Sequence, residues 1–190
     1  MKRQKMIRIA TVTSLVLLLG VPALRAQQSR AEAKAEAKGQ RGQFSERDFK
    51  FVTEVARGGM AEVQLGELAK QKGASQSVRS FGERMVTDHN KANDELKQIV
   101  TQKGAALPAE LSQHERSSLE KLEKATGKDF DKVYAKDMVR DHKKDVKEFQ
   151  NAAKDCNDPD LRAFAQKTLP TLQEHLRLAQ EMETAVKGEK

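Results

Sequence analysis

The residues of this chain best suited to chemistry fall in two stretches with the same pattern. The hexapeptide RMVTDH, which ends at His89, recurs as DMVRDH, which ends at His142. In each copy a methionine (Met85 or Met138) precedes the histidine by four residues, so the two side chains project from one face of a helix. That face is otherwise apolar and is expected to be buried. Each stretch therefore places an imidazole where a hydrocarbon side chain would be expected.

Two further polar residues, Glu62 and His175, fall on apolar stripes of their own. Burial of an isolated carboxylate or imidazole costs several kcal/mol unless the group is paired, neutralised or bound to a cation. When neighbouring helices run antiparallel from the predicted loops, Glu62 lies less than one helical turn along the axis from His89. In the same way, His175 lies within about one turn of His142. The four side chains are therefore predicted to converge in a polar layer across a helical bundle.

A metal ion, bound for storage, buffering or slow redox chemistry, is the favoured interpretation of this layer. Three imidazoles and one carboxylate suit a tetrahedral zinc-like site or a single first-row transition metal, and the pattern does not distinguish zinc, copper, iron and manganese. The predicted ligands are Glu62, His89, His142 and His175. Residues expected to support the ring nitrogens, or to serve as alternative ligands, are Asp88, Asp141, Glu174, Met85 and Met138. The two methionines are interpreted first as core filler, although as thioether ligands they would favour copper.

The same four residues allow a second interpretation, a hydrogen-bonded layer in a non-catalytic module whose surface binds an envelope protein. Ordinary di-iron chemistry is disfavoured because the Glu-x-x-His pattern is absent: Val86, Val139 and Leu172 stand three residues before the histidines. The sequence also contains no nucleophile elbow, phosphate-binding loop or catalytic Ser-His-Asp order. A hydrolase or peroxidase would rest only on an open position at a histidine-rich metal site, so the sequence leans against an enzyme without deciding the question, and it does not specify the substrate or the oligomeric state.

Long windows rich in Ala, Glu, Lys, Gln and Leu, without Gly or Pro, predict an all-α chain. Start and stop signals, such as Ser45 and the Asp158-Pro159 pair, indicate the helix ends. The predicted helices cover residues 45–72, about 75–103, 108–126, about 129–155 and 158–187, the third opening at Pro108. A weak repeat, VRSFG and LRAFA, supports two hairpins. Two hairpins joined by a crossover that contains a short helix are typical of a ferritin-like four-helix bundle, which is therefore the predicted fold. An up-and-down bundle is the alternative.

The N-terminal 26 residues combine basic side chains up to Arg8, an apolar stretch and small residues near Ala26, a pattern typical of a Sec-type signal peptide. An uncleaved membrane anchor is the alternative, although the apolar run is short for a crossing. Residues 27–44, which alternate Ala with charged side chains, predict a flexible tether, and residues 45–187 the folded domain. We therefore expect a periplasmic or otherwise exported protein whose mature chain has no transmembrane span.

The formal net charge of +7 comes mainly from this N-terminal segment. Residues 1–26 hold five basic and no acidic side chains, so the rest of the chain carries a net charge of +2. A basic surface that attracts nucleic acid is therefore not expected in the mature protein.

Cys156 is the single cysteine of the chain. It cannot form an internal disulfide, although export would place it in an oxidising compartment. It lies in DCNDP, which reads as a turn between helices, so we expect a thiol at the surface.

Several motifs occur in the order found in the bacterial exported family called domain of unknown function 4142. They are FVTE and GMAEV within residues 51–63, RMVTDH at 84–89, LP at 107–108, FDxxY at 130–134, MVxDH at 138–142 and LPxLxxHL at 169–176. The chain resembles this family over about residues 46–185. The resemblance implies a ferritin-like bundle of the outer membrane or periplasm with no settled activity. Glu62 and the three histidines correspond to motif residues of the family, whereas their role as ligands is inferred from the residues themselves.

Overall fold

The computed structural model describes residues 25–27 and 39–188 of the 190-residue chain. The predicted signal peptide, except for residues 25 and 26, and most of the predicted tether lie outside the described residues. The folded unit that carries the four polar residues begins at Gly39.

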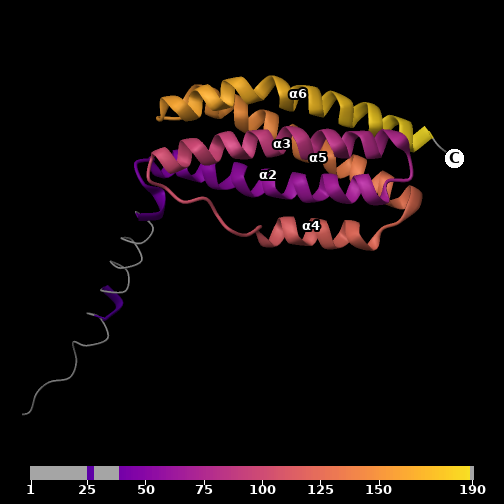
Figure 1. The fold of residues 1–190 in the computed structure, drawn as a ribbon, viewed down its shortest axis with the longest axis horizontal. Helices are drawn as coiled ribbons and strands as arrows, with labels where there is room; N and C mark the ends of the chain where they lie inside the picture. Colours follow the sequence, from indigo (N-terminus) through magenta and orange to yellow (C-terminus); the bar gives the residue numbers. More distant parts are fainter. Residues whose placement is uncertain (1–24, 28–38, 189–190) are drawn as a thin grey trace, which may run out of the picture. The chain divides into compact units, whose positions relative to one another are not determined.

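Five main helices of this unit form two antiparallel hairpins and a crossover. They are α2 (Glu46–Lys72), α3 (Gln76–Gln102), α4 (Gln113–Lys124), α5 (Gly127–Asp155) and α6 (Pro159–Gly188). α2 pairs with α3 and α5 with α6, while α4 lies along α2 in the connection between the hairpins (Figure 1). The described residues contain no strand, so the predicted all-α class and its hairpins are confirmed. None of the described helices combines the length and the hydropathy that a bilayer crossing requires.

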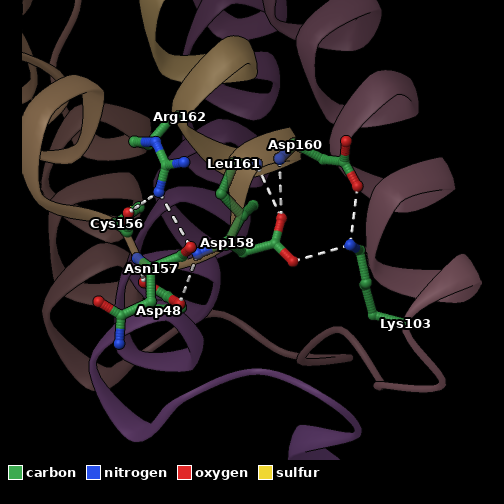
Figure 2. Close-up of polar contacts among 8 residues, drawn as sticks. All are labelled: Asp48, Lys103, Cys156, Asn157, Asp158, Asp160, Leu161 and Arg162. Carbon is green, nitrogen blue, oxygen red and sulfur yellow. Dashed lines mark hydrogen bonds and ion pairs between the residues drawn. The ribbon is translucent and has the colours of Figure 1, made fainter.

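The N-terminal ends of α2, α3 and α6 are capped by short polar side chains. The hydroxyl of Ser45 accepts the amide of Asp48 at 3.1 Å, and that of Ser75 accepts the amide of Val78 at 3.3 Å. Asp158 accepts two backbone amides at the start of α6 (Figure 2). These three caps lie where the sequence signals placed the helix starts.

Each hairpin turn is held by an aspartate from the opposite hairpin. Asp131, the fifth residue of α5, accepts the amides of Ala74 and Ser75 in the α2–α3 turn at 2.9 and 2.7 Å. Asp48, in the first turn of α2, accepts two successive amides of the α5–α6 turn, beginning at Asn157, at 2.9 and 3.1 Å (Figure 2). Both carboxylates are buried. Hydrogen bonds to charged acceptors are the stronger kind, so the two aspartates fix one hairpin against the other.

An arginine completes each turn at an equivalent place. Arg79 donates to the carbonyl oxygens of Gly73 and Ala74, and Arg162 donates to those of Cys156 and the next residue. Figure 2 shows Arg162 and Asp48 approaching the same turn. Because the two arginines are the second residues of VRSFG and LRAFA, the weak sequence repeat corresponds to a repeated turn structure.

Asp48→Ala is expected to lower the free energy of unfolding of the metal-free protein by about 2–4 kcal/mol. The reason is that two amides of the α5–α6 turn would lose a charged acceptor. Denaturant unfolding followed by circular dichroism measures the change. The matched control is Asp155→Ala, which removes an exposed ion pair with Arg47 and should cost less than about 1 kcal/mol. Equal losses in the two variants would show that Asp48 does not hold the turn.

The core consists of two apolar clusters with a polar layer between them. One cluster, toward the α2–α3 turn, contains Phe81 and Phe130. The other, toward the α5–α6 turn, contains Phe51, Phe149 and Phe164. On each long helix one buried polar residue lies between the two clusters, and these residues are Glu62, His89, His142 and His175. The predicted polar layer across the bundle is therefore present.

α2 and α3 approach closely at two glycines beside this layer. A Cβ added at Gly66 would lie 2.8 Å from the carbonyl oxygen of Gly82, and one added at Gly82 would lie 2.7 Å from that of Gly66. A glycine inside a helix costs about 1 kcal/mol relative to alanine, and here that cost allows backbone contact. The contact sets the register that brings the polar residues of α2 and α3 to one level.

α4 begins later than predicted, so Pro108 is not the first residue of a helix. The Ser112 hydroxyl accepts the amide of Glu115, and the Glu115 carboxylate accepts the amide of Ser112. This capping box satisfies two of the amides that every helix start leaves without partners. Pro108 lies in the irregular segment before it.

The prediction of a surface thiol is wrong. Cys156 follows the last residue of α5, and its side chain turns into the cluster that contains Phe149 and Phe164, leaving 6% of the residue exposed. Burial, followed by the nearby charge of Asp48, raises the pKa of the thiol to about 12. The thiolate is therefore scarce at neutral pH, and Cys156 contributes to packing.

The folded unit also includes the last residues of the predicted tether. Phe44 is buried in the same cluster as Phe51. Gln43 donates its amide to the carbonyl oxygen of Lys103 at 3.0 Å, which attaches the segment to the end of α3. An apolar residue just before the Ser45 cap is the signal for this packing that the sequence contains.

Candidate metal centre

Three histidines from three helices meet in the polar layer. His89 lies on α3, His142 on α5 and His175 on α6, and their exposed fractions are 8%, 0% and 1%. The ring centroids are 5.9 Å apart for His89 and His142, 5.5 Å for His89 and His175, and 5.3 Å for His142 and His175. The three rings are therefore close neighbours of one another, and all three residues are buried.

One nitrogen of each ring is available as a ligand. The Nε2 atoms of His89 and His142 and the Nδ1 atom of His175 are buried and have no hydrogen-bond partner among the described residues. One ligand nitrogen from each ring lies within 4.8 Å of the other two. A tetrahedral ion with bonds of about 2.0–2.1 Å needs nitrogens roughly 3.4 Å apart. Small ring rotations would therefore bring three nitrogens onto one ion.

The other nitrogen of two of these rings is fixed by an acceptor. His142 Nδ1 donates to the carbonyl oxygen of Met138 at 2.9 Å, and His175 Nε2 donates to Asp88 at 2.8 Å. Because these acceptors carry no proton, each ring must donate through that nitrogen. The neutral rings therefore keep their lone pairs on the unpartnered nitrogens, as histidine ligands of metals do.

The surroundings keep the three rings neutral. Burial lowers the pKa of His142 to about 4. Burial also lowers the pKa of His89 well below its usual value, and the neighbouring His142 and His175 add to the shift. The pKa of His175 is lowered by burial, which the Asp88 carboxylate partly opposes. A metal therefore has few protons to displace at neutral pH.

Phe81 covers one side of the histidine group. Its ring lies edge-on at 6.1 Å from His142 and 6.5 Å from His175, measured between centroids. Met85 and Met138 are fully buried in the same apolar cluster. Water is thereby excluded from this side, and any further ligand must approach from elsewhere.

Glu62 is buried at the level of the histidines but does not belong to their group. A Cβ added at Gly59 would clash with the side chain of Asn93. α2 and α3 are therefore in close contact both before Glu62, at Gly59, and after it, at Gly66. The Oε2 atom of Glu62 has no hydrogen-bond partner among the described residues. Glu62 lines a separate cavity of about 80 Å³, which Asp145 of α5 also lines. The role of Glu62 as a ligand stays a prediction.

Glu62→Gln is expected to raise the free energy of unfolding of the metal-free protein at pH 7 by roughly 1–3 kcal/mol. Burial, then the charges of Asp145 and Asp141, raises the pKa of Glu62 well above its usual value. The pKa of Glu62 is higher in the folded state than in the unfolded state. The wild type is therefore most stable below the unfolded-state pKa, where the carboxyl is protonated in both states, and it loses stability as the pH rises toward the folded-state pKa. The advantage of the variant should therefore vanish near pH 4.

Urea unfolding of both proteins between pH 4 and 8 measures this difference. Glu120→Gln, an exposed change on α4, is the control and should follow the wild type at every pH. A Glu62→Gln variant that is less stable at pH 7, or that differs by a constant amount at all pH values, would contradict the account.

The predicted supporting residues divide into those that contact the histidines and those that do not. Asp88 binds His175, as predicted, and Met138 contributes its backbone oxygen to His142. Asp141 instead pairs with Arg140, and Glu174 pairs with Arg177. Those two carboxylates neutralise surface cations.

The sequence prediction missed several polar groups close to the site. Tyr134 is fully buried, and its hydroxyl has no partner in the described part of the chain. Burial, followed by the charge of Glu62, raises its pKa well above the usual value. Asp145 and Glu148 line a cavity that also contacts His89. They follow His142 by three and six residues on α5, and the helical spacing of Asp145 was a usable signal.

Comparison with known proteins adds a family and a fold. The family model described as domain of unknown function (DUF4142) matches residues 33–182. A search of curated proteins returned no match. Among solved structures, the chain is similar to a crystal structure of a DUF305 fragment from Deinococcus radiodurans, with a TM-score of 0.64 and 14% identity over 76% of this chain and 97% of that one. At this identity the similarity concerns the helical fold alone.

Proposed function

The chain belongs to the family described as domain of unknown function (DUF4142), and we propose that within it this protein binds one transition metal ion in the bundle core. The ligands are His89 Nε2, His142 Nε2 and His175 Nδ1. Held between three helices, the ion also joins the two hairpins. The fold in this proposal is a ferritin-like bundle, and the protein is exported to the periplasm by its Sec-type signal peptide.

The observation that carries this proposal is the set of three buried ring nitrogens that have no partner within residues 25–27 and 39–188. A buried polar atom that lacks a hydrogen bond costs about 1–3 kcal/mol. The alternative, a hydrogen-bonded layer in an envelope module, would pair these nitrogens with one another or with donors nearby. Instead, each of the three rings has a buried nitrogen without a partner among the described residues, and one ligand nitrogen of each ring lies within 4.8 Å of the other two, which is an arrangement that a cation stabilises.

The donor set favours zinc or copper over manganese. Neutral imidazoles suit zinc, copper, iron and nickel, whereas manganese prefers carboxylate and water oxygens. Three protein ligands leave a fourth position for water or another small ligand. With one ion for each domain, buffering or transfer of the metal fits better than bulk storage. Glu62, Met85 and Met138 remain candidate additional ligands.

Asp88→Asn is expected to weaken metal affinity about 10–100-fold, because a carboxylate that orients a histidine ligand also raises its basicity. Competition with a chelator of known affinity measures the change. Asp94→Asn is the matched control, since Asp94 is an exposed residue of the same helix. An affinity unchanged by Asp88→Asn, with the fold intact, would mean that His175 does not bind the ion through Nδ1.

Metal titration of untagged protein tests the proposal itself. Equilibrium dialysis against zinc, copper, iron or manganese should show about one equivalent retained for at least one of them. If none of the four is retained, the metal function is wrong, and the envelope-module alternative becomes the better description.

A further inference from the structure

A cavity lies beside the histidine group. Its volume is about 60 Å³, enough for a few water molecules. Residues from all four long helices line it, and His89 and His175 are among them. His89 is 92% buried, and its Nε2 atom has no partner among the described residues. A histidine that has a buried ring nitrogen without a partner among the described residues therefore lines this cavity.

The cavity lining is acidic. Five of the residues that line it are aspartate or glutamate, and Lys144 is the lysine among them. Glu54 and Glu148 share a hydrogen bond, and burial is the main cause that raises the pKa of Glu148 to about 8 and that of Asp145 to about 7. Carboxyl groups crowded in this way favour a cation, which relieves their mutual repulsion.

The acidic side chains form a graded path from solvent to the histidines. Glu54 is exposed, Glu148 and Asp145 are half-buried, and His89 is buried. Along α5, Asp145 and Glu148 lie about 4.5 and 9 Å beyond His142 at a rise of 1.5 Å per residue. Phe81 covers one side of His142 and His175. A hydrated ion thus meets carboxylate oxygens first and imidazoles last.

We propose that this acidic cavity, with Glu54 and Glu148 at its mouth and Asp145 one turn of α5 beyond His142, is the route by which a divalent cation loads the site. The inference rests on the proposed metal function. The carboxylates bind the partly hydrated ion weakly and exchange its water for oxygen ligands. The three imidazoles then take the ion, and the route works in the reverse direction for release.

Gly58 offers an independent way to test the route. It lines the cavity from α2, and a Cβ added there would have no other heavy atom within 4 Å. Gly58→Leu should therefore fill space in the cavity without a change in charge. The helix should tolerate this change, because leucine favours helical structure more than glycine does.

Stopped-flow binding of Co²⁺, followed by its visible absorption, tests the proposal. Glu54→Gln/Glu148→Gln should slow association about 10-fold, the lower range of electrostatic steering effects. Dissociation, measured with excess chelator, should slow by a similar factor, so that Kd changes by less than about threefold. Gly58→Leu should also slow both rates. The control Glu120→Gln/Glu123→Gln removes two charges from α4 and should bind as the wild type does.

The possible outcomes separate this inference from the proposed function. If the wild type binds Co²⁺ and Glu54→Gln/Glu148→Gln binds it at the same rate, the loading route is wrong and the metal site stands. An equal slowing in the control pair would likewise overturn the route, because overall charge would then explain it. If the wild type binds neither Co²⁺ nor any of the metals in the dialysis, the proposed function fails, and the route fails with it.

Discussion

His142→Gln is expected to weaken metal binding by at least about 100-fold. Structural zinc sites with four ligands contribute roughly 10–16 kcal/mol, so one ligand accounts for about 3 kcal/mol, or about 100-fold in Kd. His142 is the most buried of the three histidines, and its free Nε2 is set by the bond from Nδ1 to Met138. Isothermal titration with the metal identified by dialysis measures the affinity.

The fourth histidine of the chain provides the control for this experiment. His114 lies on α4 and is exposed. His114→Gln should leave the affinity unchanged. If it weakens binding as much as His142→Gln does, the ion lies near α4 and outside the three-histidine group. His142→Ala, checked by circular dichroism, separates loss of the ligand from an effect of the new amide.

Metal loading is expected to raise the melting temperature of the wild type by about 8–16 °C. A ligand present at 1,000 times its Kd stabilises the native state by about 4.1 kcal/mol. In a domain of 150–250 residues, each kcal/mol shifts Tm by about 2–4 °C. The effect is large because the ion connects α3, α5 and α6. Calorimetry at pH 7.5, with and without the metal, measures it.

The same scans on a histidine variant show whether the gain comes from the site. His175→Gln should melt at nearly the same temperature with and without metal. A full shift in this variant would place the stabilising ion elsewhere. A wild type without any shift, at a metal concentration where dialysis shows binding, would mean that the ion does not link the helices.

The helices and the polar layer could be predicted because both depend on local spacing. The stripe through Met85 and Leu96 passes through His89 and leaves Asp88 at its edge, and the structure has His89 buried and Asp88 bound to His175. The Ser45 and Asp158 signals specified helix starts, because caps act within one turn of the chain.

The parts that could not be predicted depend on contacts between distant residues. Periodicity indicates that Glu62 is buried, but it does not determine which way the carboxyl turns within the layer. The orientation is decided by packing against α4 and α5. The prediction for Cys156 was wrong for a related reason. A turn sequence does not reveal that the side chain packs into the core cluster near Asp48. Pro108 was predicted to begin a helix because proline is common at the first helical position. The Ser112 capping box, four residues later, begins α4 instead.

X-ray absorption spectroscopy of the loaded protein tests the central claim most directly. With one equivalent of zinc, the account predicts a first shell with three imidazole nitrogens at about 2.0–2.1 Å, and loss of the imidazole scattering in His142→Gln. A first shell of oxygen atoms alone, or a spectrum that is the same in wild type and variant, would contradict it.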